Sequence, residues 1–297
     1  MKIKNVSRLV TAACVLLVVA GVAAAQKGVK PIVFAILTDG TTVEPIAYVD
    51  KGKLEAPVGG DSSATAIAAF DKAYYKAGTV YKLIFGGANV GTVTAKSYDP
   101  KAECSKNFGT VTTKSAKVTL KGLVMGLATN APIKSTTASY RRKPTDAEKA
   151  EMDALAKAEY AKQKLSPKVL HYQNLTAIDV DNDGKAEFVG TYWVEIDKLT
   201  RGLLFFIAQK GSNGKYAIAY RDYRSVDQAN VMSQNIKDVD EGVYNELLLD
   251  SFDYDGDGTN EIFTYTQSFE GAGYAVYRKS GGKWVKAFDG ANYHCAY

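Results

Sequence analysis

Two acidic segments in the second half of the chain carry side chains suited to holding a metal ion. Both follow the pattern Asp-x-Asp-x-Asp-Gly-x-x-Glu, over residues 179–187 and 253–261. Carboxylates at alternate positions converge when the backbone curls around a point, and glycine at the sixth position permits the sharp turn. The backbone carbonyl of the seventh residue can add an oxygen. The predicted ligands are Asp179, Asp181, Asp183, Glu187 and the Lys185 carbonyl in the first loop, and Asp253, Asp255, Asp257, Glu261 and the Thr259 carbonyl in the second.

This donor set favours calcium at two sites. Four carboxylates and one carbonyl supply at least five oxygens per loop, and Ca²⁺ takes roughly six to eight oxygen ligands in flexible geometry. Mg²⁺ demands tighter octahedral geometry, and Zn²⁺ favours His or Cys, which neither loop contains. Without a cation, two carboxylates ~4 Å apart repel by about 4 kcal/mol at an effective dielectric constant of 20. We therefore expect a bound ion to hold each loop closed.

The sequence around the loops excludes an EF-hand or a dockerin. Such a loop needs a bidentate acid at its twelfth position and a helix on each side. The twelfth residues here are Gly190 and Thr264, and the segments that follow the loops, 188–193 and 262–266, are rich in strand-forming residues. Each loop is therefore expected to join two strands.

Residues 168–297 show the same order of expected elements twice. Each copy predicts a strand, the acidic loop, two strands, a glycine-containing turn and a last strand, with the turns at residues 211–214 and 280–282. This order predicts a duplicated unit of about four antiparallel strands. Two units cannot close a propeller of four or more blades. We therefore expect a stacked or sandwiched pair of sheets that packs against the first domain.

An Asp-rich loop between two strands resembles the FG-GAP/VCBS calcium-binding repeats of integrin-α-type β-propellers. The resemblance covers residues 168–297 only, and the four carboxylates of each loop fall on the ligand positions of that family. Glu187 and Glu261 stand where the family usually has Asp, and the Phe-Gly and Gly-Ala-Pro signatures of the family are absent around the loops. The resemblance implies bound Ca²⁺ and a β-propeller-like arrangement, and it says little about biological role.

The rest of the mature chain predicts a β-rich domain and one linking helix. Thr145 and Glu148 form a capping-box pattern after Pro144, so residues 144–166 predict an amphipathic helix that ends before Pro167. The fold class is therefore mainly β, with an N-terminal β-rich domain, a linking helix and a C-terminal domain of two four-strand units. Within the N-terminal domain, residues 27–140, the expected strands are Ile32–Leu37, Val43–Val49, Val80–Phe85, Val90–Ala95 and Lys117–Leu127, with a helix over Ala64–Tyr75.

Residues 1–25 are typical of a secretory signal peptide. Three basic residues precede the apolar run Leu9–Ala25, and three alanines at its end suit cleavage near Ala25–Gln26. An uncleaved anchor is the alternative, although the run is at the short limit for a membrane span. We expect an exported protein, periplasmic or extracellular, with no membrane span after cleavage.

Two cysteines, Cys104 and Cys295, remain in the mature chain. In an oxidising compartment an even count is compatible with one disulfide, which would tie the C-terminus to the N-terminal half. Two separate thiols are equally compatible with the sequence.

Composition restricts the classes of partner. The chain is 46% hydrophobic and 23% charged, which is ordinary for a globular protein. The net charge of +5 includes three basic residues of the signal peptide, so 34 basic and 32 acidic residues, a charge of +2, remain. Such a balance offers no electrostatic basis for binding nucleic acid.

Several other polar residues are expected to be structural. The two histidines, His171 and His294, offer no catalytic constellation, and Trp193 and Trp284 are expected in the core. The basic run 141–143 is expected to be a solvated linker. Asp238, Asp240 and Glu246 lack the third Asp of the pattern, so their segment is expected to be an ordinary surface loop.

The leading functional hypothesis is an exported, non-enzymatic calcium-binding protein whose ions are mainly structural. Its loops would serve binding, adhesion or envelope assembly, with a protein or carbohydrate ligand that the sequence does not identify. The alternative is a secreted hydrolase, for example on polysaccharide, with a calcium-stabilised scaffold. An acid pair outside the two loops that faces a tyrosine-lined cleft would favour it. A third hypothesis is an envelope protein whose acidic loops stay empty.

Overall fold

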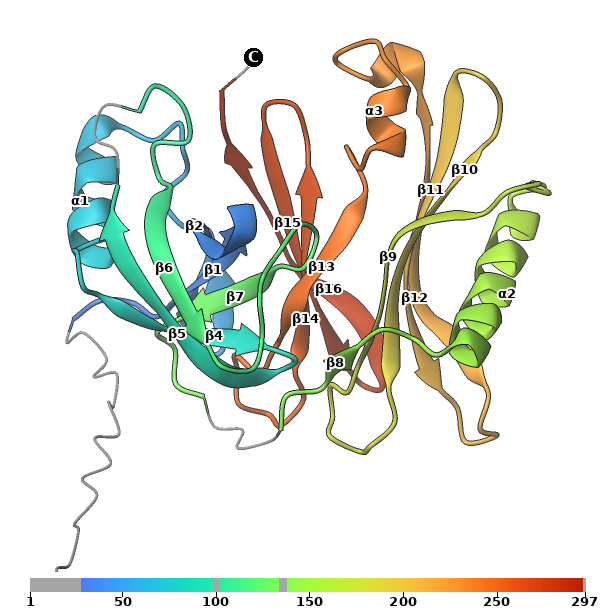
Figure 1. The fold of residues 1–297 in the computed structure, drawn as a ribbon, viewed down its shortest axis with the longest axis horizontal. Helices are drawn as coiled ribbons and strands as arrows, with labels where there is room; N and C mark the ends of the chain where they lie inside the picture. Colours follow the sequence, from blue (N-terminus) through green and yellow to red (C-terminus); the bar gives the residue numbers. More distant parts are fainter. Residues whose placement is uncertain (1–27, 99–101, 134–137, 296–297) are drawn as a thin grey trace, which may run out of the picture.

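The computed structural model describes residues 28–98, 102–133 and 138–295. The predicted signal peptide lies outside the described residues and stays a prediction. Within those ranges the chain is mainly β, with an N-terminal barrel, a helix and two antiparallel sheets, so the predicted fold class is confirmed (Figure 1). No helix in these ranges has both the length and the hydrophobicity needed to cross a membrane.

The N-terminal sheet closes into a six-stranded barrel. Its strand order is β1-β7-β4-β5-β6-β2, and β1 pairs with both β2 and β7, while β3 extends the sheet beyond β2. Phe34 points into a buried cluster with Tyr81 and with Phe70 and Tyr74 of helix α1 (Ala64–Tyr74). The strands are β1 (Ile32–Leu37), β2 (Thr42–Asp50), β3 (Lys53–Glu55), β4 (Val80–Phe85), β5 (Ala88–Ser97), β6 (Gly109–Ser115) and β7 (Gly126–Thr129).

One segment of the barrel differs from the sequence prediction. A single strand over Lys117–Leu127 is wrong, because the strand begins only at Gly126. Before it, Ser115 Oγ accepts hydrogen bonds from the backbone N–H groups of Lys117 (3.0 Å) and Val118 (3.2 Å), which directs the chain into turns. Strand β6 was not predicted, and its pairing with both β5 and β2 completes the barrel.

The C-terminal half forms two antiparallel sheets. The first has the order β12-β11-β10-β9-β8, in which the two-residue β8 extends the predicted four strands, and the second has the order β13-β14-β15-β16. In each sheet an acidic loop joins the first two strands of the predicted unit. The strands are β8 (Arg141–Arg142), β9 (His171–Ile178), β10 (Glu187–Glu195), β11 (Thr200–Lys210), β12 (Tyr216–Asp227), β13 (Glu246–Phe252), β14 (Glu261–Gln267), β15 (Gly271–Ser280) and β16 (Lys283–Tyr293).

Figure 1 shows the order of the layers, and two buried clusters hold the barrel and the two sheets together. Val33 and Ile84 on the outside of the barrel pack against Phe263 of the β13–β16 sheet. The opposite face of that sheet packs against the β9–β12 sheet, with Tyr277 and Val189 in the shared core. Two stacked sheets that pack against the first domain were expected, and the structure confirms this arrangement.

Helix α2 (Asp146–Lys162) covers the remaining face of the β9–β12 sheet. The predicted capping box is present: Thr145 Oγ1 accepts from the Glu148 N–H group (3.3 Å), and Glu148 Oε2 accepts from the Thr145 N–H group (2.8 Å). Met152 and Tyr160 then pack against the apolar face of the sheet. The helix therefore links the two halves and also completes a core.

Cys104 and Cys295 form a disulfide, with their Cα atoms 4.9 Å apart. Next to it, Glu44 of the barrel accepts a hydrogen bond from Asn292 Nδ2 (2.6 Å), and His294 Nε2 lies 2.9 Å from the same oxygen. The C-terminal strand is therefore fastened to the barrel by a covalent bond and by a buried polar network.

Candidate metal centres

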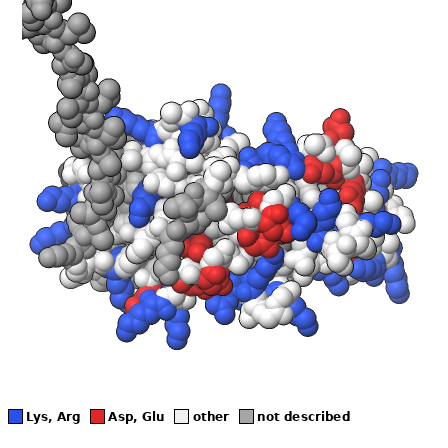
Figure 2. All heavy atoms as spheres, turned by 90° about the horizontal axis from the view of Figure 1, so that it is seen from below, with Lys and Arg blue, Asp and Glu red and all other residues white. Residues whose placement is uncertain are grey.

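The two acidic loops lie side by side at one end of the stacked sheets, the lower end in Figure 1. The backbone N–H group of Asn260 in the second loop donates to the carbonyl of Val180 in the first (2.7 Å). Figure 2 views this end of the molecule and shows groups of acidic side chains among lysines and arginines. The stacking of the sheets therefore brings together two loops whose first residues, Asp179 and Asp253, are 74 positions apart in the sequence.

In the first loop, the side chains of Asp179, Asp181 and Glu187 converge. One carboxylate oxygen from each lies within 4.8 Å of the others. Asp179 Oδ2 accepts from the Gly184 N–H group (3.0 Å), and Glu187 Oε2 accepts from the Val180 N–H group (3.1 Å), so the loop backbone orients both side chains. Asp179 Oδ1 is buried and has no hydrogen-bond partner among the described residues.

The second loop repeats this geometry with Asp253, Asp255 and Glu261. Their carboxylate oxygens also lie within 4.8 Å of one another. Asp253 Oδ2 accepts from the Gly258 N–H group (3.1 Å), and Glu261 Oε2 accepts from the Tyr254 N–H group (3.1 Å). Since the same positions make the same bonds in both loops, the two sequence patterns specify one local structure.

The third Asp of each pattern lies outside these groups. Asp183 Oδ1 accepts from the Lys185 N–H group (2.7 Å), and Asp257 Oδ1 accepts from the Thr259 N–H group (2.8 Å). The structure thus brings together three of the four predicted carboxylates in each loop. Ligation by the fourth carboxylate and by the carbonyls of Lys185 and Thr259 stays a prediction.

Left-handed backbone at two positions allows each loop to curl. The sixth-position glycines, Gly184 (φ 79°) and Gly258 (φ 96°), have the conformation expected of them. The fourth positions are also left-handed, with Asn182 at φ 59° and Gly256 at φ 79°. Asn and Gly are the residues that tolerate this conformation best, so the fourth position was a signal that the sequence prediction missed.

Burial perturbs the ionisation of the converging acids. It raises the pKa of Glu187 to about 7 and that of Glu261 to about 8, and it also raises the pKa of Asp255. Desolvation disfavours the charged form of a carboxyl group, and a bound cation would favour it again. By contrast, hydrogen bonds from Lys185 lower the pKa of the outlying Asp183.

A lysine from the second sheet enters the first loop, which the sequence prediction did not anticipate. Lys279 Nζ, on β15, lies 2.8 Å from Asp181 Oδ2 and 3.6 Å from Glu187 Oε1. In the second loop the corresponding neighbour is more distant, since Arg278 Nη1 lies 3.7 Å from Asp255 Oδ2. No local spacing rule places these cations, because they reach the loops through the stacking of the sheets.

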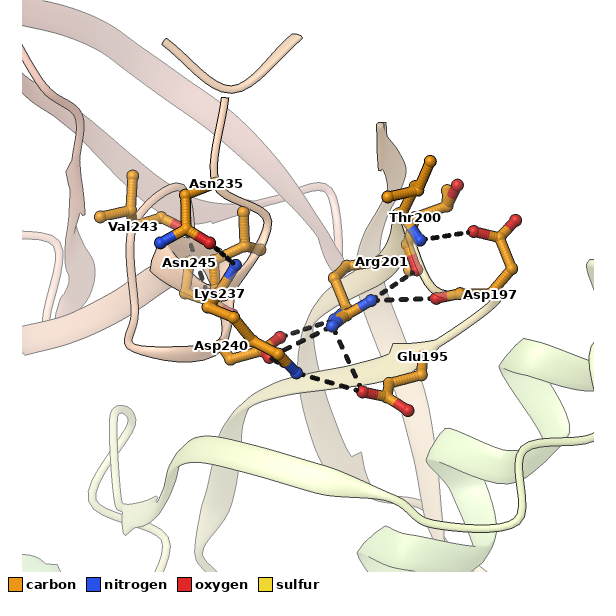
Figure 3. A network of polar contacts seen from close by, with 12 residues as sticks. Glu195, Asp197, Thr200, Arg201, Asn235, Lys237, Asp240, Val243 and Asn245 are labelled. Carbon is orange, nitrogen blue, oxygen red and sulfur yellow. Dashed lines mark hydrogen bonds and ion pairs between the residues drawn. The ribbon is translucent and has the colours of Figure 1, made fainter. Parts of the chain in front are cut away.

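The third acidic segment does not form a metal-binding group. Asp240 ends the short helix α3 (Lys237–Asp240) and pairs with Arg201, whose Nε lies 2.6 Å from Asp240 Oδ1 (Figure 3). The Arg201 guanidinium is buried and also contacts Glu195 Oε1 (3.2 Å) and the Asp197 carbonyl (3.1 Å). In the described parts of the chain, only the two loops gather three or more potential ligands.

A small cleft outside the acidic loops also contains acidic side chains. Glu246 Oε1 accepts from Thr264 Oγ1 (2.6 Å) and Tyr277 OH (2.7 Å), and burial raises the pKa of this carboxyl group. Asp222 and Tyr274 line the same cleft, whose volume is about 250 Å³. Two acids outside the loops thus line one cleft, as the hydrolase hypothesis requires, whereas the Tyr274 ring itself is buried in the core between the barrel and the second sheet.

The basic run 141–143 is more than a solvated linker. Arg141 Nη1 pairs with the buried Asp250 (2.8 Å), and Arg142 makes two hydrogen bonds of 2.7 Å to Glu148. His171 stacks on Trp193 with the ring centroids 3.9 Å apart, so its ring serves packing. Trp193 and Trp284 are both buried, as expected.

No family model, curated protein or solved structure matches the chain. The resemblance to FG-GAP/VCBS repeats therefore stays a hypothesis about residues 168–297.

Proposed function

We propose that the protein binds two Ca²⁺ ions, one in each acidic loop, and that these ions stabilise the end of the stacked sheets. One observation carries this proposal: two loops with matching hydrogen bonds each present three converging carboxylates. In the first loop, a buried oxygen of Asp179 also lacks a hydrogen-bond partner among the described residues. A buried acceptor without a partner is costly, and a cation would satisfy it.

The chemistry of the donors supports calcium over other ions. Each group offers carboxylate oxygens, and no His or Cys belongs to either loop. Hard oxygen ligands in an adaptable loop suit Ca²⁺. Binding to the folded state alone would contribute about 2.7 kcal/mol per site when the ion concentration is 100 times Kd.

The biological setting of this function is an exported binding, adhesion or envelope protein, as in the FG-GAP/VCBS hypothesis. Calcium would then rigidify the loop end of the two sheets, so that neighbouring loops present a fixed surface to a protein or carbohydrate. The disulfide between Cys104 and Cys295 supports the proposed export, because such bonds persist in oxidising compartments outside the cytosol.

Calcium titration with paired loop variants tests the proposal. Calorimetry of the mature protein is expected to show two sites, with one lost in Asp181→Ala and the other in Asp255→Ala. The melting temperature is expected to fall on addition of EGTA. Asp289→Ala is the matched control, because this carboxylate is 73% exposed and pairs only with Lys286 among the described residues. Absence of calcium binding, or unchanged melting in EGTA, would contradict the structural role.

A hydrolase is the second candidate, and Glu246 favours it. One oxygen of this buried carboxyl group is held by two hydroxyl groups, and the other makes no hydrogen bond to the described residues. Such a group can exchange a proton with a substrate in the cleft. Release of reducing ends from a panel of polysaccharides, abolished in Glu246→Gln and retained in the exposed variant Glu241→Gln, would support this function. A wild-type protein inactive on the whole panel would argue for the binding role.

A further inference from the structure

We propose that the two loops bind Ca²⁺ with unequal affinity, because Lys279 acts as a built-in counter-ion in the first loop that the metal ion must displace. This inference rests on the proposed calcium-binding function and concerns its regulation. The second loop fills first, and the first loop fills only when calcium is high enough to compete with the lysine.

The position of the Lys279 ammonium group carries this inference. Its Nζ lies 2.8 Å from Asp181 and 3.6 Å from Glu187, two of the three converging carboxylates. The ammonium group thus neutralises the same oxygens that a metal ion would use. A cation that binds these oxygens has to break this pair first, and the cost of breaking it lowers the apparent affinity of the loop.

The surroundings of Lys279 make this pair stronger than an ordinary surface ion pair. Only 22% of the side chain is exposed, and Nζ lies 5.4 Å from the centre of the Trp284 ring. Partly buried charges are screened less by water and salt than exposed ones. Lys279 is nevertheless a long, flexible side chain, so it can leave the site without a change in the backbone.

In the part of the chain that the structure describes, no cation lies as close to the carboxylates of the second loop. Among the described residues, its converging acids make one ion pair, in which Arg278 Nη1 lies 3.7 Å from Asp255 Oδ2. The Arg278 side chain is 40% exposed. The residue at the seventh position of each loop also makes the first loop more positively charged than the second. Lys185 in the first loop pairs with Asp183 (2.8 Å), whereas Thr259 in the second loop is uncharged. The first loop therefore holds more positive charge of its own.

The pair also joins the two sheets. Lys279 belongs to β15 of the second sheet, and Asp181 belongs to the loop between β9 and β10 of the first. In the metal-free protein the lysine fastens the loop to the neighbouring sheet, and a metal ion takes over that role after displacing it. Removal of the lysine is therefore expected to weaken the metal-free protein and to strengthen calcium binding.

Calorimetric titration of the first loop alone measures the effect. Asp255→Ala removes the second site, and in this background Lys279→Met is expected to tighten calcium binding by roughly fivefold. Lys279→Gln, which keeps a polar side chain of similar length, is expected to act in the same direction. Lys72→Met removes a lysine from the exposed face of α1 and is the charge-matched control, with unchanged affinity expected.

Melting in EGTA provides a readout without metal. Here Lys279→Met is expected to melt below Lys72→Met, and the difference should shrink when calcium is added. Equal first-loop affinities with and without Lys279, or a wild-type first loop that fills before the second, would overturn the inference while leaving calcium binding intact. If the wild-type protein binds no calcium at all, the proposed function itself fails.

Discussion

The buried ion pair between Asp250 and Arg141 joins the two C-terminal sheets at the point where they meet the barrel, since Arg141 belongs to β8 and Asp250 to β13. Asp250, on β13, accepts hydrogen bonds from the N–H groups of Gly86 (3.0 Å) and Gly87 (3.1 Å) in the β4–β5 turn. Arg141 Nη1 lies 2.8 Å from Asp250 Oδ2, and the two side chains are 7% and 0% exposed. Removal of either charge therefore leaves the other in a poorly solvated interface.

The expected loss follows from that burial. Asp250→Asn keeps the size of the side chain, removes its charge and replaces one acceptor oxygen with an amide donor that faces a backbone N–H group. We expect the free energy of unfolding to fall by about 3–5 kcal/mol, which is typical when one partner of a buried pair is removed. Arg141→Met is expected to cost a similar amount. The double variant is expected to cost less than the sum, because it leaves no unpaired charge.

Urea denaturation of the four proteins at one pH measures these losses and their coupling. Asp289→Asn serves as the control, since it breaks an exposed pair with Lys286 (3.1 Å) and is expected to cost less than about 1 kcal/mol. The reasoning is refuted if Asp250→Asn costs no more than Asp289→Asn. Strictly additive effects of the two single variants would also refute it, because they would show that the buried charges do not depend on each other.

Two further predictions concern stability. The disulfide joins residues separated by 191 positions, so reduction, or Cys104→Ala with Cys295→Ala, is expected to lower the free energy of unfolding by about 2–5 kcal/mol, measured by urea denaturation with and without a reductant. Burial raises the pKa of Asp71 from 3.8 to about 6, so the folded state binds a proton more tightly than the unfolded state. This contribution to stability is fully present below pH 3.8 and is lost as the pH rises through 6. Asp71→Asn is therefore expected to melt higher than the wild type at neutral pH and to lack this pH dependence, and an unchanged pH profile of melting would contradict the assignment.

The acidic loops could be predicted from sequence because their structure is local. The first Asp, the sixth glycine and the final Glu lie within nine residues, and the bonds from Gly184 to Asp179 and from Val180 to Glu187 form inside that span. Asp183 lies outside the converging group for an equally local reason, because the N–H and ammonium groups of Lys185 both donate to its carboxylate. A pattern of alternating acids does not reveal such bonds.

Features that depend on tertiary contacts could not be predicted from the sequence. Closure of the barrel depends on β7, a strand of four residues that pairs with both β1 and β4. Lys279 reaches Asp181 only because the two sheets stack, and no spacing along the chain encodes that approach. The disulfide was left open for the same reason, since a count of cysteines does not show whether two of them meet.

Each of the two C-terminal sheets is covered on both of its faces. A sheet in the middle of a stack needs a partner on each face. β13 is buried at every position, although it includes the polar residues Glu246, Asp250 and Ser251, and β10 is buried at every position except its last. The barrel covers the outer face of the second sheet and α2 covers the outer face of the first, so both outer faces are buried. On this basis the barrel and the helix are integral to the fold of residues 168–297, and we expect that segment, expressed alone, to expose both outer faces and to aggregate. A soluble, cooperatively melting fragment of residues 168–297 would show instead that the two sheets are an independent domain.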